Sequence, residues 1–118
     1  MTAALPLQNE DLNSPISLRF GRSPYFAIIN KETGTVEVTA NPYYQLSSGA
    51  GKHIVEFLTG KYYVDTLIAF ELGLNVMQIA NQSKLRLIII HEKNKSLKSI
   101  LDRMQISITE SEIIQKPK

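Results

Sequence analysis

The sequence contains no cysteine among its 118 residues. Disulfide bonds and thiolate-ligated metal sites are therefore excluded, because both need the cysteine sulfur. The chain also lacks an apolar run near the ~20 residues that a membrane-spanning helix needs. Its first residues show no charged segment followed by an apolar one, the pattern of a secretory signal. These absences favour a cytoplasmic protein without a membrane segment.

An excess of charge of one sign is also missing. The 13 Lys and Arg residues nearly balance the 11 Asp and Glu residues, which leaves a formal net charge of +2. A domain that binds nucleic acid usually carries a strong basic excess on one face. The composition therefore argues against a nucleic-acid partner, and the basic residues of the second half are interpreted as solvated surface.

Hydrophobic residues make up 43% of the chain and charged residues 20%, which is ordinary for a globular domain. A chain of 118 residues is long enough to bury one hydrophobic core. We expect residues 1–104 to form a single domain. Residues 105–118 are expected to form a tail whose structure the sequence does not indicate.

Hydrophobic periodicity divides the domain into five strands and three helices. The strands are expected at residues 3–7, 25–30, 36–40, 64–70 and 85–90, and the helices at 51–59, 73–81 and 95–103. Short loops between the first three strands favour an antiparallel meander, and the later alternation of strand and helix favours parallel crossovers. The predicted fold is α/β, with a single mixed five-stranded sheet and flanking helices.

Two strands have features that bear on assembly. The aliphatic run Leu85–Ile90 is typical of a strand that is covered on both faces. The strand at Val36–Ala40 is expected at an edge of the sheet, where its backbone groups could pair with a second copy of the chain. A homodimer formed through this edge is one assembly that the sequence allows.

A glycine between bulky and charged residues stands directly before the predicted hairpin. In the segment Arg19-Phe20-Gly21-Arg22, the glycine allows a sharp bend between two guanidinium groups. Guanidinium groups bind oxyanions through paired hydrogen bonds. The loop is a candidate anion site, and solvated surface arginines are the alternative interpretation.

A second candidate anion site precedes the first helix. Ser48, Gly49, Ala50 and Gly51 are expected around its first turn, where free N–H groups and the helix dipole favour an anion. The segment lacks the spacing of a P-loop, and a simple N-cap is the alternative. His53 follows on the first turn. It is either a ligand of iron or molybdenum through a neutral imidazole or an exposed residue without a ligand.

The arginine loop also carries a resemblance to a known family. Residues 11–26 read D-L-N-S-P-I-S-L-R-F-G-R-S-P-Y-F. This segment and the hairpin after it resemble the opening of the dinitrogenase iron-molybdenum cofactor biosynthesis family, and the similarity extends over residues 3–104. The resemblance implies a ribonuclease H-like sheet whose second strand is antiparallel to the rest, which agrees with the fold predicted from the pattern of the residues.

The resemblance further implies a cofactor pocket. In the family, the arginine loop and the glycine turn flank this pocket, and the turn between the fourth strand and the second helix closes it. The implied ligand is the iron-molybdenum cofactor or another anionic cluster that contains iron or molybdenum. The implied cofactor-binding residues are Arg19, Phe20, Gly21, Arg22, Ser48, Gly49, Ala50, Gly51, Gly73 and Asn75.

We expect a non-catalytic carrier of such a cluster, or of an oxyanion, rather than an enzyme. A two-metal nuclease would need carboxylates gathered at strand ends, and those of Glu10, Asp11, Asp65 and Glu71 are not expected to converge. In a carrier, the two arginines neutralise the anion and the helix amides donate hydrogen bonds. Cofactor-assembly proteins would be its partners. The alternative is an interaction or regulatory module that keeps the fold and binds no cluster.

Overall fold

The computed structural model of the chain describes residues 1–46, 49–92 and 95–115. Its strands are β1 (Thr2–Leu7), β2 (Tyr25–Asn30), β3 (Thr35–Ala40), β4 (Thr66–Ala69), β5 (Arg86–Ile89) and β6 (Ile114–Gln115). Its helices are α1 (Ala50–Tyr62), α2 (Leu74–Gln82) and α3 (Leu97–Arg103), and Glu110–Glu112 form a 3-10 turn. The predicted order of strands and helices is confirmed.

The strands form one mixed sheet in the order β5-β4-β1-β2-β3-β6. β2 is antiparallel to both of its neighbours, β1 and β3. β4 is parallel to β1, and β5 is parallel to β4. The second strand therefore runs against the others, as the ribonuclease H-like arrangement requires. β6 pairs in parallel with β3 and adds a two-residue strand to the five that the sequence predicts.

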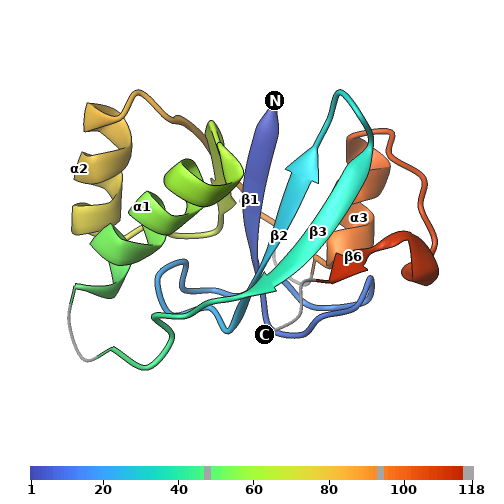
Figure 1. Ribbon diagram of the computed structural model, residues 1–118, viewed down its shortest axis with the longest axis horizontal. Coiled ribbons are helices and arrows are strands. Elements are labelled where there is room, and N and C mark those ends of the chain that lie inside the picture. The colour runs from blue at the N-terminus through green and yellow to red at the C-terminus, as the bar shows by residue number, and fades with distance from the viewer. Residues whose placement is uncertain (47–48, 93–94, 116–118) are drawn as a thin grey trace.

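Helices cover both faces of the sheet, so the molecule has three layers (Figure 1). Side chains of α1 and α2 pack into one hydrophobic core, and side chains of α3 pack into a second core on the opposite face. Ala3 and Leu5 of β1 belong to the α3 core, whereas Ala4 between them belongs to the other. This alternation follows from the two-residue period of a strand. Within the described residues, we find no helix with the length and apolarity that crossing a membrane requires.

β5 differs from its prediction. It is the last strand at one end of the sheet, and Ile88 and Ile89 are 39% and 38% exposed. The prediction that Leu85–Ile90 is covered on both faces is therefore wrong. An apolar run shows that a strand is aliphatic, but its place in the sheet order decides how much of it the neighbouring elements cover.

The tail covers part of the other end of the sheet. β6 pairs with β3 at Glu37 and Val38, and Ile113 before it is buried in the α3 core. A homodimer contact along Val36–Ala40 would therefore meet the chain's own tail. Because two residues of pairing add little, burial of the Ile106 and Ile113 side chains contributes more to the attachment of this segment.

Candidate functional site

A cavity of about 450 Å³ lies beside the first turns of α1 and α2, where the chain leaves the carboxyl end of β4. Three segments that are far apart in the sequence line it: the arginine loop, the start of α1, and the turn from β4 into α2. Every predicted cofactor-binding residue that the structure describes is among its lining residues: Arg19, Phe20, Gly21, Arg22, Gly49, Ala50, Gly51, Gly73 and Asn75. Ser48, the remaining predicted residue, lies outside the described residues.

Buried contacts hold the arginine loop in place. Phe20 is 2% exposed, and its ring packs on Phe26 of β2 with centroids 5.0 Å apart. Asn41 Nδ2 donates a hydrogen bond to the carbonyl of Ser23 at 2.8 Å. The backbone of the loop is therefore anchored to the sheet, while the side chains of Arg19 and Arg22 on either side of the buried phenylalanine reach the surface.

Glycines allow the three segments to approach closely. A Cβ atom placed on Gly21 would lie 3.6 Å from the Cα and N atoms of Gly51. A Cβ atom on Gly51 would lie 2.5 Å from Val76 Cγ2 of α2, closer than side chains can approach. Gly49, before α1, has a φ of +75°, in the left-handed region that glycine adopts without strain. These positions bring the loop and the two helix ends to one cavity.

Both helices present their N-terminal ends to the cavity. The N-cap residues are Gly49 for α1 and Gly73 for α2, and glycine has no side chain to accept a hydrogen bond from the first-turn amides. Neither first turn carries an acidic residue. Within the described residues, no side chain caps either helix. The first amides can therefore bond to an outside acceptor, and both helix dipoles favour an anion at the same place. A carboxylate, phosphate or inorganic oxyanion suits such a site.

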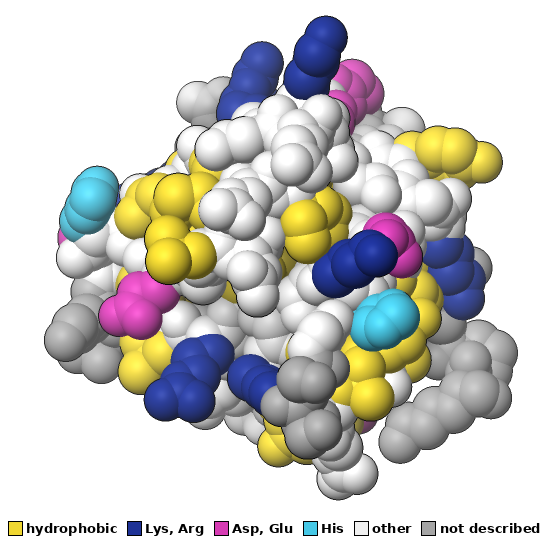
Figure 2. All heavy atoms as spheres, turned by 90° about the vertical axis from the view of Figure 1, so that its left-hand side faces the viewer, with side chains coloured by type: hydrophobic (Ala, Val, Ile, Leu, Met, Phe, Trp, Pro, Cys, Tyr) yellow, Lys and Arg dark blue, Asp and Glu magenta, His cyan; other side chains and the backbone are white. Residues whose placement is uncertain are grey.

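The charged side chains of the cavity are Arg19, Arg22 and Glu71. Arg22 Nη1 donates a hydrogen bond to the carbonyl of Leu46, and the backbones of Arg19 and Glu71 form an isolated parallel bridge. Figure 2 shows the side of the molecule that α2 faces, where basic side chains occur singly or in pairs among acidic and uncharged ones. The two arginines outnumber the one glutamate among the lining residues of the cavity, and this face shows no continuous basic groove.

His53 lies on the exposed surface of α1, and it is not among the residues that line the cavity. Its ring stacks on Tyr43, with centroids 5.0 Å apart and an angle of 20° between the planes. Among the described residues, no group of three or more His, Cys, Asp or Glu side chains is placed to hold a metal ion. The cavity therefore offers amide and guanidinium donors to an anion. Metal ligation by His53 stays a prediction.

Three lining residues were not predicted as site residues: Glu71, Leu72 and Val76. Glu71 and Leu72 lie in the turn between the fourth strand and the second helix, which the resemblance places at the pocket without assigning either of them a binding role. Val76 is one of several apolar residues of α2, and the face that meets α1 depends on how the two helices pack. Gly51 was the available signal, because a glycine in a first helical turn allows a close neighbour, but it does not identify that neighbour.

This chain resembles several solved structures. The apo form of the orange protein from Desulfovibrio gigas has 20% sequence identity and a TM-score of 0.78, with 88% of this chain and 86% of that chain covered. A NifB-like protein from Thermotoga has 28% identity and a TM-score of 0.72, with 88% and 86% covered. The similarity to the orange protein shows the fold alone. No curated protein matches the chain. The family profile described as dinitrogenase iron-molybdenum cofactor matches residues 1–106, so the chain belongs to this family.

Proposed function

We propose that this protein is a non-catalytic carrier of an anionic cluster or oxyanion that contains iron or molybdenum, such as the iron-molybdenum cofactor or a precursor. One observation carries the proposal: two helix N-termini and two arginine side chains line a single cavity of about 450 Å³. A cavity of this size is ordinary for a small-ligand site. Family membership supports the identity of the cargo.

The donors of the cavity suit the anionic atoms of a cargo better than its metal ions. The amides at the starts of α1 and α2 would donate to sulfide, oxide or carboxylate groups, and Arg19 and Arg22 would neutralise their charge. The chain has no cysteine to form a metal–thiolate bond. A cargo held through hydrogen bonds and charge is exchanged more readily than one held by thiolates. This property suits a carrier that receives its cargo from one cofactor-assembly protein and delivers it to another in the cytoplasm.

The lining residues offer little to covalent catalysis. Among those that the structure describes, Glu71 is the one carboxylate, and none is Ser, Cys, His or Lys. A nucleophile paired with a base, as group-transfer enzymes use, is thus not found among them. This composition supports a binding role over an enzymatic one.

Metal analysis of anaerobically purified protein, together with its absorption spectrum, tests the proposal. We expect bound iron or molybdenum in the parent protein, or uptake of molybdenum after incubation with molybdate. Replacing Arg19 by Gln should reduce the bound metal, because one of the two cations in the cavity is lost. The matched control is Lys98→Gln, which removes an exposed charge on α3. A parent that binds neither iron, molybdenum nor molybdate would favour the interaction or regulatory module.

The same samples test the predicted ligand His53. If its imidazole binds a metal ion, His53→Ala should lower the metal content and shift the absorption bands of the bound cluster. If the cargo is held only by the cavity, both quantities should match those of the parent protein. His53→Ala also removes the ring that stacks on Tyr43. Both samples must therefore be equally well folded for the comparison to report on metal binding.

A further inference from the structure

β5 leaves one end of the sheet open. β6 pairs with β3 at the opposite end, but within the described residues no strand pairs with the outer side of β5. Ile88 and Ile89 are each more than one-third exposed, and Arg86 is the one charged residue of the strand. An open, aliphatic edge is a template for pairing with another strand, and proteins usually protect such edges when they are not used.

The outer backbone groups of β5 can be assigned from its pairing with β4. The N–H groups of Arg86 and Ile90 donate to carbonyls of the β4 segment at 2.9 Å and 2.8 Å. In a parallel ladder, alternate residues of a strand bond to the same neighbour. The N–H and C=O groups of Leu87 and Ile89 therefore point away from the sheet. They form a short row of two donors and two acceptors.

The edge also has an apolar hollow beside it. Ile88 is level with Ile68 of β4 and shares the face of the sheet that α3 covers. A cavity of about 270 Å³ opens there, and its lining includes Ile68, Ile88, Ile90, Ile100 and Met104. An added strand would cover the open side of this hollow while its backbone pairs with β5. Backbone pairing plus contact with an adjacent apolar pocket is the usual physics of strand addition.

We propose that a second copy of this chain is the added strand, paired antiparallel with β5 so that Ile88 of each copy lies at the two-fold axis. In this register, Leu87 of one copy faces Ile89 of the other and exchanges both backbone hydrogen bonds with it. The same exchange occurs on the other side of the axis. All outward-pointing groups of both strands are then paired, and the two sheets become continuous. The interface is closed, because each copy has used its open edge.

Charge favours a second copy as the occupant. Lys84 and Arg86 lie at the amino end of β5, and Glu92 follows its carboxyl end. The antiparallel register places the basic end of each copy beside the Glu92 end of the other. Glu92 is exposed, and its carboxylate lies 3.0 Å from Lys95 and 2.7 Å from Arg103 of its own chain, so Lys84 of the other copy would join an existing ion-pair cluster. A parallel arrangement would instead set the basic ends side by side, where like charges repel.

Sedimentation equilibrium of the full chain over a wide range of concentration tests this interface. We expect a reversible monomer–dimer equilibrium that weakens at high salt, because the end charges are screened. Ile88→Lys should weaken dimerisation about tenfold or more, since it sets two cations opposite each other at the axis. The matched control is Ile114→Lys, which changes an exposed isoleucine on the opposite edge strand. It should dimerise like the parent protein.

A second variant separates pairing from folding. Ile89→Pro removes an outward N–H group but no bond to β4, and proline is tolerated on an edge strand in this orientation. We expect a folded monomer by circular dichroism and sedimentation. The proposal is wrong if the parent protein stays monomeric at every concentration, or if its mass grows beyond two copies. It is also wrong if Ile88→Lys and Ile89→Pro dimerise as strongly as the parent protein does.

Discussion

At the scale of single residues, the contact between Gly51 and Val76 sets the distance between α1 and α2. A Cβ atom on Gly51 would lie 2.5 Å from Val76 Cγ2, so no larger residue fits unless the helices separate. Gly51 also lies close to Gly21 of the arginine loop. Because both helix N-termini line the cavity, this spacing controls how their amides converge on a ligand. A change of one methyl group is therefore felt at the site.

The substitution Gly51→Ala tests this relation. Overpacking a tight contact costs about 1–3 kcal/mol, and alanine returns up to about 1 kcal/mol through its higher helix propensity. We expect a net loss of roughly 1 kcal/mol in the free energy of unfolding, measured by urea denaturation. We also expect weaker molybdate binding in calorimetric titration, because the two helix ends are pushed apart.

A double-mutant cycle with Val76→Ala supplies the control. This second substitution removes the Cγ atom that the new methyl group would meet. In the Val76→Ala background, Gly51→Ala should be neutral or stabilising, since only the helix-propensity gain remains. An equal cost in both backgrounds would show that the Val76 contact is not the cause.

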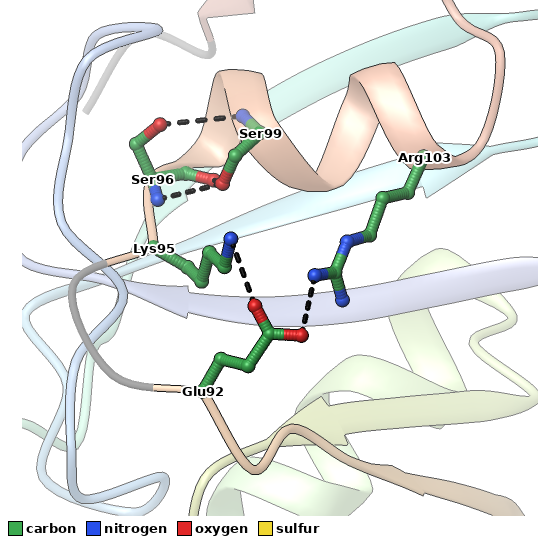
Figure 3. A network of polar contacts seen from close by, with 5 residues as sticks. All are labelled: Glu92, Lys95, Ser96, Ser99 and Arg103. Carbon is green, nitrogen blue, oxygen red and sulfur yellow. Dashed lines mark hydrogen bonds and ion pairs between the residues drawn. The ribbon is translucent and has the colours of Figure 1, made fainter.

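At the scale of elements, α3 is held at its start by side chains. Ser96 and Ser99 form a capping box: the Ser99 amide donates to Ser96 Oγ at 3.2 Å, and the Ser96 amide donates to Ser99 Oγ at 2.9 Å (Figure 3). Glu92, which follows β5, bonds to Lys95 before the helix and to Arg103 at its end. The helix begins at Leu97 and not at the predicted residue 95, because Ser96 is the N-cap.

The Glu92 contacts predict a dependence of stability on pH. Hydrogen bonds from Arg103 and Lys95 lower the pKa of the Glu92 carboxyl below its ordinary value. A lowered pKa in the folded state means that the stabilisation is present above the unfolded-state pKa and is lost as pH falls through the folded-state pKa. Glu92→Gln should therefore lower the urea midpoint at neutral pH. At a pH below the folded-state pKa, where both states bind the proton, the midpoints of parent and variant should agree.

A control on α1 shows whether this loss is specific. Glu56→Gln removes an exposed carboxylate at a distance from α3 and should leave the pH dependence of the parent protein unchanged. Raising the salt concentration should shrink the effect of Glu92→Gln, because the ion pairs are at the surface. A difference that persists at low pH would mean that Glu92 acts through packing and not through its charge.

The sequence predicted the order of the elements better than their surroundings. Alternation in β3 and helical spacing in α3 are local patterns, and both elements form as expected. The helix expected to end at residue 59 continues through Gly60 to Tyr62. Its C-cap is Tyr63, which is in the left-handed conformation and donates its N–H to the Leu58 carbonyl. The exposure of β5 and the pairing of β6 depend on the sheet order, which a local pattern does not contain.

At the scale of the whole molecule, the candidate site combines what the sequence showed with what only packing could decide. The arginine loop and the glycine turn have local signatures, and the resemblance added Gly73 and Asn75. The fold brings these segments to one cavity because they lie at the same end of the sheet. Val76 was not predicted, because its position follows from the packing of two helices. His53 was predicted next to the glycine turn, but its ring turns to Tyr43.

Binding in this cavity should also stabilise the whole fold, because the converging amides and arginines exist only in the folded state. Ligand at one hundred times its Kd adds about 2.7 kcal/mol to the free energy of unfolding. For a chain of this length, such a gain raises the Tm by on the order of 10 °C. We expect molybdate to raise the Tm of the parent protein and of Lys98→Gln by the same amount, and of Arg19→Gln by clearly less. Chloride at equal ionic strength is the reference in each case. An equal rise in all three proteins would assign the effect to the salt itself and not to an anion bound between α1 and α2.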